Sequence, residues 1–308
     1  MSRISAMAKL ILLLGFFIAI ISIQATGEDP ATFFFTDARE NPGKVYSSNM
    51  SGGESVYFAR PSGNIYSFAF HPYVPEKLYY VNANDNKIYL AARIPDGPWT
   101  AIDQVAYTHR TYIRDLEYFP GSGPRDLRVY FSEATGAGGD GKIYYLAPGG
   151  TATLDYTVRL SDVDGFWAGY FIHDSNGNLY LSSGNRIPAS IYKVSGGTVS
   201  RIYTSNSAPI TGMVYQDGCI YYANWGTEIH RLDLSTLVDT VVRSQPGHSW
   251  ISDVGLRGVS VASIGWLERK SAETITTRSS QGISKKGIGQ LGDVHVLYGE
   301  MSQEMSIK

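Results

Sequence analysis

The segment closest to a known chemical motif is glycine-rich, residues 136–142, and contains the spacing Gly-x4-Gly-Lys of a phosphate-binding loop. In that motif a Ser or Thr after the lysine holds Mg²⁺, and a helix follows. Here Ile143 comes after Lys142, and apolar runs typical of strands flank the segment. We therefore interpret it as a hairpin connection and not as a nucleotide site.

Two further segments, residues 82–86 and 174–178, gather Asp and Asn side chains whose oxygens could ligate Ca²⁺. Neither is followed by the bidentate carboxylate that completes a calcium-binding EF-hand loop. Asn176-Gly177 between two apolar runs is a typical hairpin turn. Turn formation explains both segments without a metal.

Histidine and cysteine usage gives no local catalytic motif. The six histidines are scattered without a His-Glu-x-x-His pattern, and the sequence has no Gly-x-Ser-x-Gly nucleophile elbow. Cys219 is the single cysteine, so no intramolecular disulfide can form, and its apolar neighbours predict that it packs as a small hydrophobic residue.

Composition bounds the protein class. The net charge of −2 lacks the basic excess that nucleic-acid binding requires, and 43% apolar against 18% charged residues predicts a folded chain. Tyr (22 residues) suits pleated strands, and Gly (33 residues) suits tight turns. These counts favour an all-β protein with many short strands, which we expect to be a monomer.

The N-terminus has the order of a secretory signal. Arg3 and Lys9 precede the apolar run 10–23, and the small residues Ala25 and Gly27 follow it. The run is short for a membrane span of roughly 20 residues, although an uncleaved anchor is the alternative. We predict a signal peptide over residues 1–27 and a secreted or cell-surface protein. Asn49 begins an Asn-Met-Ser glycosylation acceptor.

The elements that would position any site come from a recurring phrase of two strands. An aromatic-rich strand is followed by a polar turn, and the next strand opens with an aliphatic–aromatic pair. The first strands of the five copies are 33–37, 78–82, 129–133, 179–183 and 220–224, and the second are 44–46, 87–90, 142–146, 191–194 and 228–232. Copies about 40 to 55 residues apart match the period of a four-stranded propeller blade.

Further strands complete each unit. Ahead of the phrase come the runs 65–70, 113–118, 167–171, 210–215 and 250–256, whose small residues suit inner strands that pack around an axis. After it come polar-alternating runs such as 152–158 and 237–242, as expected of outer strands with one face in solvent.

These residues resemble the YWTD and NHL repeats of six-bladed, TolB-like β-propellers over residues 32–257. Phe35-Thr36-Asp37 and Ala223-Asn224-Trp225-Gly226 resemble the Tyr-Trp-Thr-Asp turn, and Ile-Tyr-x-Leu resembles the strand after it.

The chain starts without an inner strand, so a strand from the other end should close the ring. We prefer six blades, with 258–308 supplying a degenerate last blade and 293–298 closing the ring. In the five-bladed alternative, 251–256 closes it and 258–308 is a loose tail.

The resemblance implies two kinds of function. Gluconolactonase-like propellers hold a divalent metal in the central channel, and Asp115, Asp253, Asn185 and Asn224 could supply its oxygen ligands here, with Ca²⁺ as the ion. We prefer a binding scaffold for a protein or glycan over this metal-dependent hydrolase, because loops on a rigid body suit recognition. The candidate binding residues lie at strand starts and in loops near the axis: Arg114, Asp115, Trp167, Trp225, Trp250 and Asp253.

Overall fold

The computed structural model describes residues 32–49, 53–71, 74, 76–82, 85–95, 97–120, 127–133, 139–147, 150–184 and 186–256. The predicted signal peptide (1–27) and the segment 258–308 lie outside the described residues. No helix within the described residues is long and apolar enough to span a membrane.

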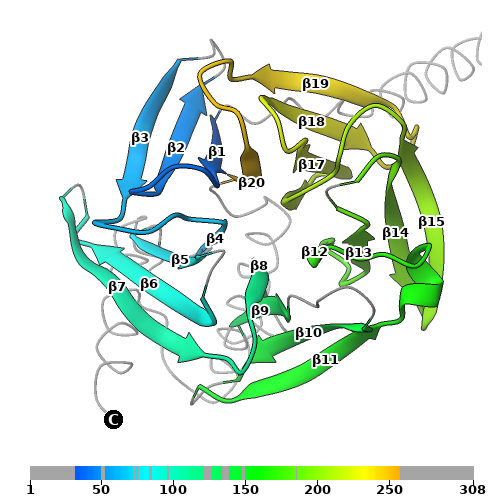
Figure 1. Ribbon diagram of the computed structural model, residues 1–308, viewed down its shortest axis with the longest axis horizontal. Coiled ribbons are helices and arrows are strands. Elements are labelled where there is room, and N and C mark those ends of the chain that lie inside the picture. The colour runs from blue at the N-terminus through cyan, green and yellow to red at the C-terminus, as the bar shows by residue number, and fades with distance from the viewer. Residues whose placement is uncertain are drawn as a thin grey trace, which may run out of the picture. The chain divides into compact units, whose positions relative to one another are not determined.

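Twenty strands in this part of the chain form five antiparallel sheets of four strands each, arranged as blades around a ring (Figure 1). The inner strands are β4 (Ser67–Phe70), β8 (Ile113–Pro120), β12 (Tyr170–His173), β16 (Met213–Gln216) and β20 (Ile251–Leu256). The second strands are β1 (Thr32–Asp37), β5 (Lys77–Val81), β9 (Leu127–Glu133), β13 (Leu179–Ser182) and β17 (Cys219–Ala223).

The third strands are β2 (Lys44–Asn49), β6 (Lys87–Arg93), β10 (Gly141–Leu146), β14 (Ala189–Ser195) and β18 (Glu228–Asp233). The outer strands are β3 (Glu54–Ala59), β7 (Trp99–Thr108), β11 (Ala152–Val158), β15 (Thr198–Ser205) and β19 (Asp239–Ser244). A short 3₁₀ helix, η1 (Leu160–Val163), precedes β12. We number the blades in chain order, so that blade 1 is β20-β1-β2-β3 and blade 5 is β16–β19.

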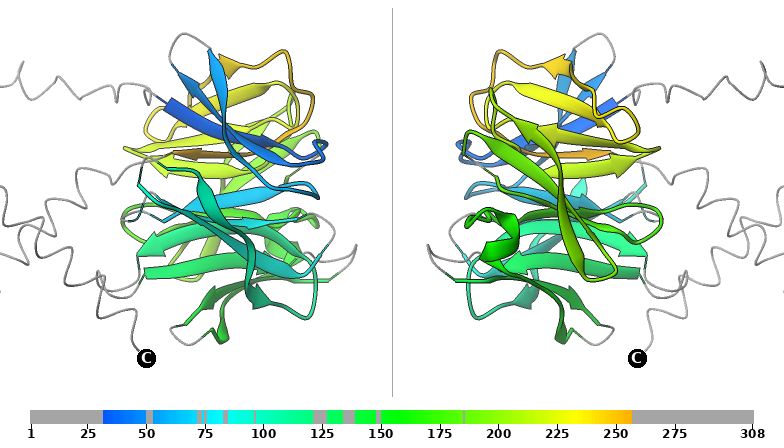
Figure 2. Two further views of the ribbon diagram at one scale, coloured as in Figure 1. Left: turned by 90° about the vertical axis from the view of Figure 1, so that its left-hand side faces the viewer. Right: turned by 90° about the vertical axis from the view of Figure 1, so that its right-hand side faces the viewer.

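The inner strands close a ring, because β4 contacts β8, β8 contacts β12, β12 contacts β16, β16 contacts β20 and β20 contacts β4. The described residues therefore form a five-bladed β-propeller. Both side views show blade 1 beside the strands of blade 5 (Figure 2).

The preferred count of six blades is not supported. Strand β20 pairs antiparallel with β1, with Phe33 opposite Leu256 and Thr36 opposite Asp253. The edge of β1 that 293–298 was expected to cover is thus already occupied. The five-bladed alternative, with 251–256 as the closing strand, is the one observed.

Stacking of aromatic rings between the second and third strands explains the aliphatic–aromatic pair that opens each third strand. The aliphatic member is fully buried in every blade, and the aromatic member stacks on the ring of the second strand in four of them. The stacked pairs are Phe35–Tyr46, Tyr80–Tyr89, Phe131–Tyr144 and Tyr222–His230, with centroids 4.9–5.6 Å apart and planes 17–19° apart. Such pairs add to the free energy of apolar burial and hold neighbouring strands in register.

Several smaller predictions are confirmed. Strand β10 begins at Gly141, within the glycine-rich segment, so no phosphate-binding helix begins at its end. The Asp174 carboxylate accepts the N–H groups of Asn176 and Asn178 and closes the β12–β13 turn. Cys219 is buried among apolar residues.

Candidate functional site

Three of the predicted binding residues come together where the inner strands begin. Arg114 is the second residue of β8, Trp225 follows β17, and Trp250 precedes β20. The indole rings of Trp225 and Trp250 lie 5.3 Å apart. Tyr66, just before β4, connects them to Arg114, because its ring is 5.7 Å from Trp225 and 4.2 Å from the Arg114 guanidinium carbon.

Two further side chains extend this group at its ends. The Tyr170 hydroxyl shares a 2.5 Å hydrogen bond with the Tyr66 hydroxyl, and the Arg114 guanidinium carbon is 5.7 Å from the Tyr170 ring. At the other end the Arg39 guanidinium carbon is 3.4 Å from the centre of the Trp250 ring. We call these six residues the axial cluster: Arg39, Tyr66, Arg114, Tyr170, Trp225 and Trp250.

Every blade contributes to the axial cluster. Arg39 and Trp250 belong to blade 1, and Tyr66, Arg114, Tyr170 and Trp225 belong to blades 2, 3, 4 and 5 in that order. Tyr66 and Tyr170 are buried, Arg114, Trp225 and Trp250 are half-buried, and Arg39 is exposed. The cluster thus has a buried base on the ring axis and an accessible rim.

The backbone is shaped to hold Arg114. Gly169 faces it with a φ of +98°, and a Cβ at Gly169 would lie 2.6 Å from Arg114 Cγ. Only glycine adopts this backbone without strain while leaving the space that the arginine fills. The position of the guanidinium over the Tyr66 ring therefore depends on the residue that precedes β12.

Trp225 also lies in an unusual conformation. Its φ is +56°, in the left-handed region that bulky residues seldom occupy. Asn224 stabilises the turn, since its Oδ1 accepts the N–H groups of Gly226 and Glu228. Backbone strain of this kind persists where the surrounding structure holds it, and it gathers at functional sites.

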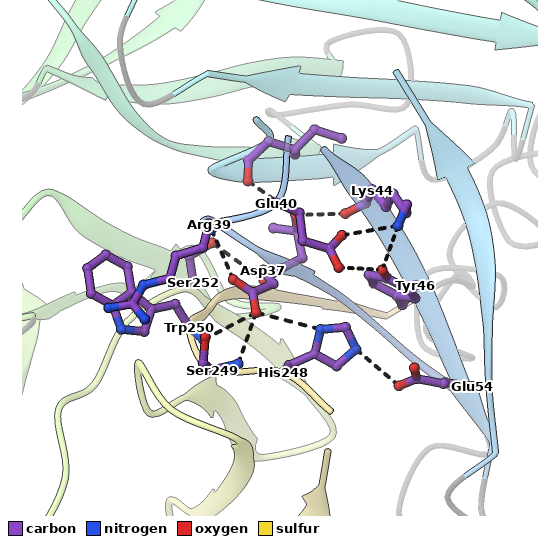
Figure 3. Close-up of polar contacts among 12 residues, drawn as sticks. Asp37, Arg39, Glu40, Lys44, Tyr46, Glu54, His248, Ser249, Trp250 and Ser252 are labelled. Atoms are coloured by element: carbon purple, nitrogen blue, oxygen red, sulfur yellow. Dashed lines mark hydrogen bonds and ion pairs between the residues drawn. The ribbon is translucent and has the colours of Figure 1, made fainter. Parts of the chain in front are cut away.

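Asp37 positions the Arg39–Trp250 end of the cluster (Figure 3). Its carboxylate accepts the N–H groups of Arg39, Ser249 and Trp250 at 2.9–3.3 Å. Burial acts to raise the pKa of Asp37, but His248 and these N–H groups outweigh it and hold the pKa well below its usual range. The ionised carboxylate fixes the turn after β1 to the turn before β20.

The two tyrosines at the base stay protonated. Burial is the main cause that raises the pKa of Tyr66 and of Tyr170. The base therefore presents neutral rings and a hydroxyl pair, and the rim presents indole faces and guanidinium N–H groups. This arrangement can bind a ligand by stacking and by donating hydrogen bonds.

Asp115 and Asp253 have a different role from the predicted one. Asp115 Oδ1 accepts the Ser67 hydroxyl at 2.8 Å, and its Oδ2 accepts the N–H of Phe171 at 3.1 Å. Asp253 accepts the N–H groups of Phe68 and Val254, both at 2.9 Å. Each carboxylate joins its own inner strand to that of the next blade, so both act as structural bridges.

These contacts do not fit a metal centre. Each carboxylate oxygen already accepts a hydrogen bond, and burial raises the pKa of both side chains, which favours their protonated forms. Asn224 is engaged in its own turn, and Asn185 lies outside the described residues. Within the described ranges no three His, Cys, Asp or Glu side chains could hold a metal ion.

Trp167 and Asn49 lie away from the cluster. Trp167 is 4% exposed, packs in the core of blades 3 and 4, and donates its indole N–H to the carbonyl of Tyr170. It is a core residue. Asn49 is exposed at the end of β2, and its glycosylation stays a prediction.

Sequence reasoning missed Tyr66, Tyr170 and Arg39. In the observed strand pairing, Ser67 and Tyr170 occupy the same place in their inner strands as Asp115 and Asp253 do in theirs. In each case the next residue of the inner strand lies opposite the third residue of the aromatic-rich run: Tyr80, Leu181, Phe131 and Phe35. Correct alignment of β4 and β12 would have placed Tyr66 beside Arg114.

Comparisons with known proteins identify no family. No family model matches the chain, and no curated protein matches it. Similar solved structures include a Bacteroides caccae protein of unknown function (TM-score 0.47, 13% identity, 73% of this chain and 98% of the other). Another is a gluconolactonase from Xanthomonas campestris (TM-score 0.45, 13% identity, 73% and 79%). A third is a PQQ-bound aldose sugar dehydrogenase from Streptomyces coelicolor (TM-score 0.42, 14% identity, 76% and 86%). Similarities this low transfer no function.

Proposed function

We propose that this protein is an exported binding scaffold that recognises a partner through the axial cluster. The observation that carries the proposal is that all five blades place aromatic or arginine side chains at one end of the ring axis. Export rests on the N-terminal segment, and kinship with YWTD and NHL propellers remains a hypothesis from the repeat.

The residue types support recognition. Trp, Tyr and Arg are the side chains that most often dominate the free energy of protein association, especially when they are packed and partly desolvated. Trp225 and Trp250 are half-buried and held by the Asn224 turn and by Asp37, so little conformational entropy is lost when they bind. A rigid, preformed aromatic surface fits a binding protein.

The hydrolase alternative has weaker support. It needs carboxylates that are free to ligate a metal, and those of Asp115 and Asp253 are occupied by hydrogen bonds between strands. We therefore place binding ahead of metal-dependent hydrolysis.

Parallel screening of peptide and glycan arrays with three forms of the protein tests the proposal. The forms are the wild type, Trp250→Ala and Leu154→Ala, the last a control for an exposed apolar side chain on β11 (49% exposed). We expect ligands whose affinity falls about tenfold or more in Trp250→Ala and stays unchanged in Leu154→Ala. Ligands that bind all three forms equally would place recognition elsewhere and contradict the proposal.

A further inference from the structure

We propose that the partner of the axial cluster is an acidic protein segment, whose carboxylates bind the guanidinium groups of Arg39 and Arg114 while its side chains cover the Trp225 and Trp250 rings. This inference rests on the proposed function, since it specifies the chemistry of the ligand that the same cluster would take.

The first argument is the state of Arg114. This half-buried guanidinium lies over Tyr66 and Tyr170, and no carboxylate among the described residues forms an ion pair with it. The neighbouring Asp115 points its oxygens to Ser67 and Phe171 instead. A partly desolvated charge without a counter-ion is costly, and an anionic ligand would offset that cost.

Arg39 repeats this pattern at the rim. Its guanidinium lies over the Trp250 ring, and within the described part of the chain its side chain forms no ion pair. The Asp37 carboxylate, two residues before Arg39, is occupied by backbone N–H groups and His248. Stacking on the indole leaves the N–H edge of the guanidinium free for two parallel hydrogen bonds to a carboxylate.

Arginines elsewhere in the propeller show the contrast. Arg60 pairs with Asp103, Arg110 with Glu133 and Arg201 with Asp164, each at 2.9–3.5 Å. Arg60 is the closest parallel, because it is buried and its guanidinium lies near the Tyr80 and Tyr89 rings. It has a carboxylate partner, whereas Arg39 and Arg114 have none among the residues that the structure describes. Charge complementarity favours a partner that brings the acids.

A protein segment is favoured over other anions by the composition of the cluster. Indole and phenol rings beside arginine are typical of the central residues of protein interfaces, where the partner supplies apolar side chains next to its charges. The segment we expect therefore combines Asp or Glu with apolar or aromatic residues.

Selection from a random dodecapeptide library displayed on phage tests the inference without a known partner. The full chain is used as wild type, as Arg39→Gln, as Arg114→Gln, as Arg128→Gln and as Trp250→Ala. Arg128, in β9, is the matched control, because its guanidinium carbon lies 4.1 Å from the centre of the Tyr145 ring of β10, outside the cluster. Polygalacturonate is tested in parallel as an acidic polysaccharide, and thermal melting verifies that each variant is folded.

We expect peptides selected on the wild type and on Arg128→Gln to be enriched in Asp and Glu, and the enrichment to fall on Arg39→Gln and Arg114→Gln. A selected peptide resynthesised with Gln and Asn in place of its acids should bind about tenfold more weakly. Its affinity for the wild type should also fall with added salt. Should Arg114→Gln not fold, Arg39→Gln decides, since Arg39 is exposed.

The outcomes separate this inference from the proposed function. Peptides that need Trp250 but carry no excess of acids would overturn the acidic partner and leave the binding site in place. Arginine-dependent capture of polygalacturonate without any selected peptide would overturn the protein partner. Absence of any Trp250-dependent binder would overturn both proposals.

Discussion

At the scale of single residues, the axis of the propeller depends on small residues that admit the carboxylate bridges. Gly212, before β16, faces Asp253, and a Cβ there would overlap the backbone and the carboxylate of Asp253. The backbone cannot move away, because Gly212 donates its N–H to Ser252. We expect Gly212→Ala to lower the free energy of unfolding by about 2–4 kcal/mol, measured by chemical denaturation.

Gly247 is the matched control. It lies in the turn before β20, a Cβ there would meet no atom within 4 Å, and its φ lies outside the left-handed region. Gly247→Ala should change the free energy of unfolding by about 1 kcal/mol or less. Equal losses in the two variants would mean that the bridge at Asp253 does not explain the effect at Gly212.

At the scale of elements, the seam between β1 and β20 carries a histidine held between acids (Figure 3). His248 Nδ1 is 3.6 Å from Asp37, at the end of β1, and its Nε2 is 3.2 Å from Glu54, at the start of β3. The nearby Asp37 carboxylate is the main cause that raises the pKa of His248. Attraction by Glu54 and Glu40 adds to it, and burial opposes it. Protonation of His248 therefore strengthens the seam.

This direction of the pKa shift determines how stability depends on pH. A histidine whose pKa is higher in the folded state stabilises fully below its unfolded pKa, about 6.5, and the gain is lost as pH rises through the folded pKa. The wild type should exceed His248→Gln in free energy of unfolding by about 1–2 kcal/mol near pH 5–6, and by less above pH 8. A difference that stays constant with pH would show that packing on Phe35 and Tyr46 alone accounts for the role of His248.

Sequence reasoning found these elements because each one carries a local signal. The aliphatic–aromatic pair of the third strand marks a position where one residue is buried and the next stacks on a ring, as Ile88 and Tyr89 do. The number of blades depends on a distant pairing, Phe33 opposite Leu256, and local patterns do not encode which C-terminal run makes that pairing. The apolar run 293–298 was an equally suitable sequence for it.

The candidate site was predicted in part. Arg114, Trp225 and Trp250 were chosen because arginine and tryptophan at strand starts suit binding; the structure brings them together, and their role in binding stays a prediction. Asp115 and Trp167 have suitable chemical types as well, but they are 2% and 4% exposed, and burial at this level is set by packing between blades. Residue type alone therefore does not separate a bridge or a core residue from a contact residue.

At the scale of the whole molecule, the closed ring predicts where the folded unit ends. If β20 completes blade 1, residues 28–257 contain every strand of the five blades, and a chain of that span should melt within about 4 °C of the full protein. A chain that stops at residue 249 lacks β20, so it exposes the edge of β1 and the buried rings of Phe33 and Phe35, and should lose its cooperative transition or aggregate. Thermal melting of the two shortened chains beside the full chain measures both effects. Loss of the cooperative transition in the chain 28–257 would mean that residues beyond 257 are needed to close the ring, and would contradict five blades. Loss of the transition only in the chain that stops at residue 249 would show that β20 closes the ring.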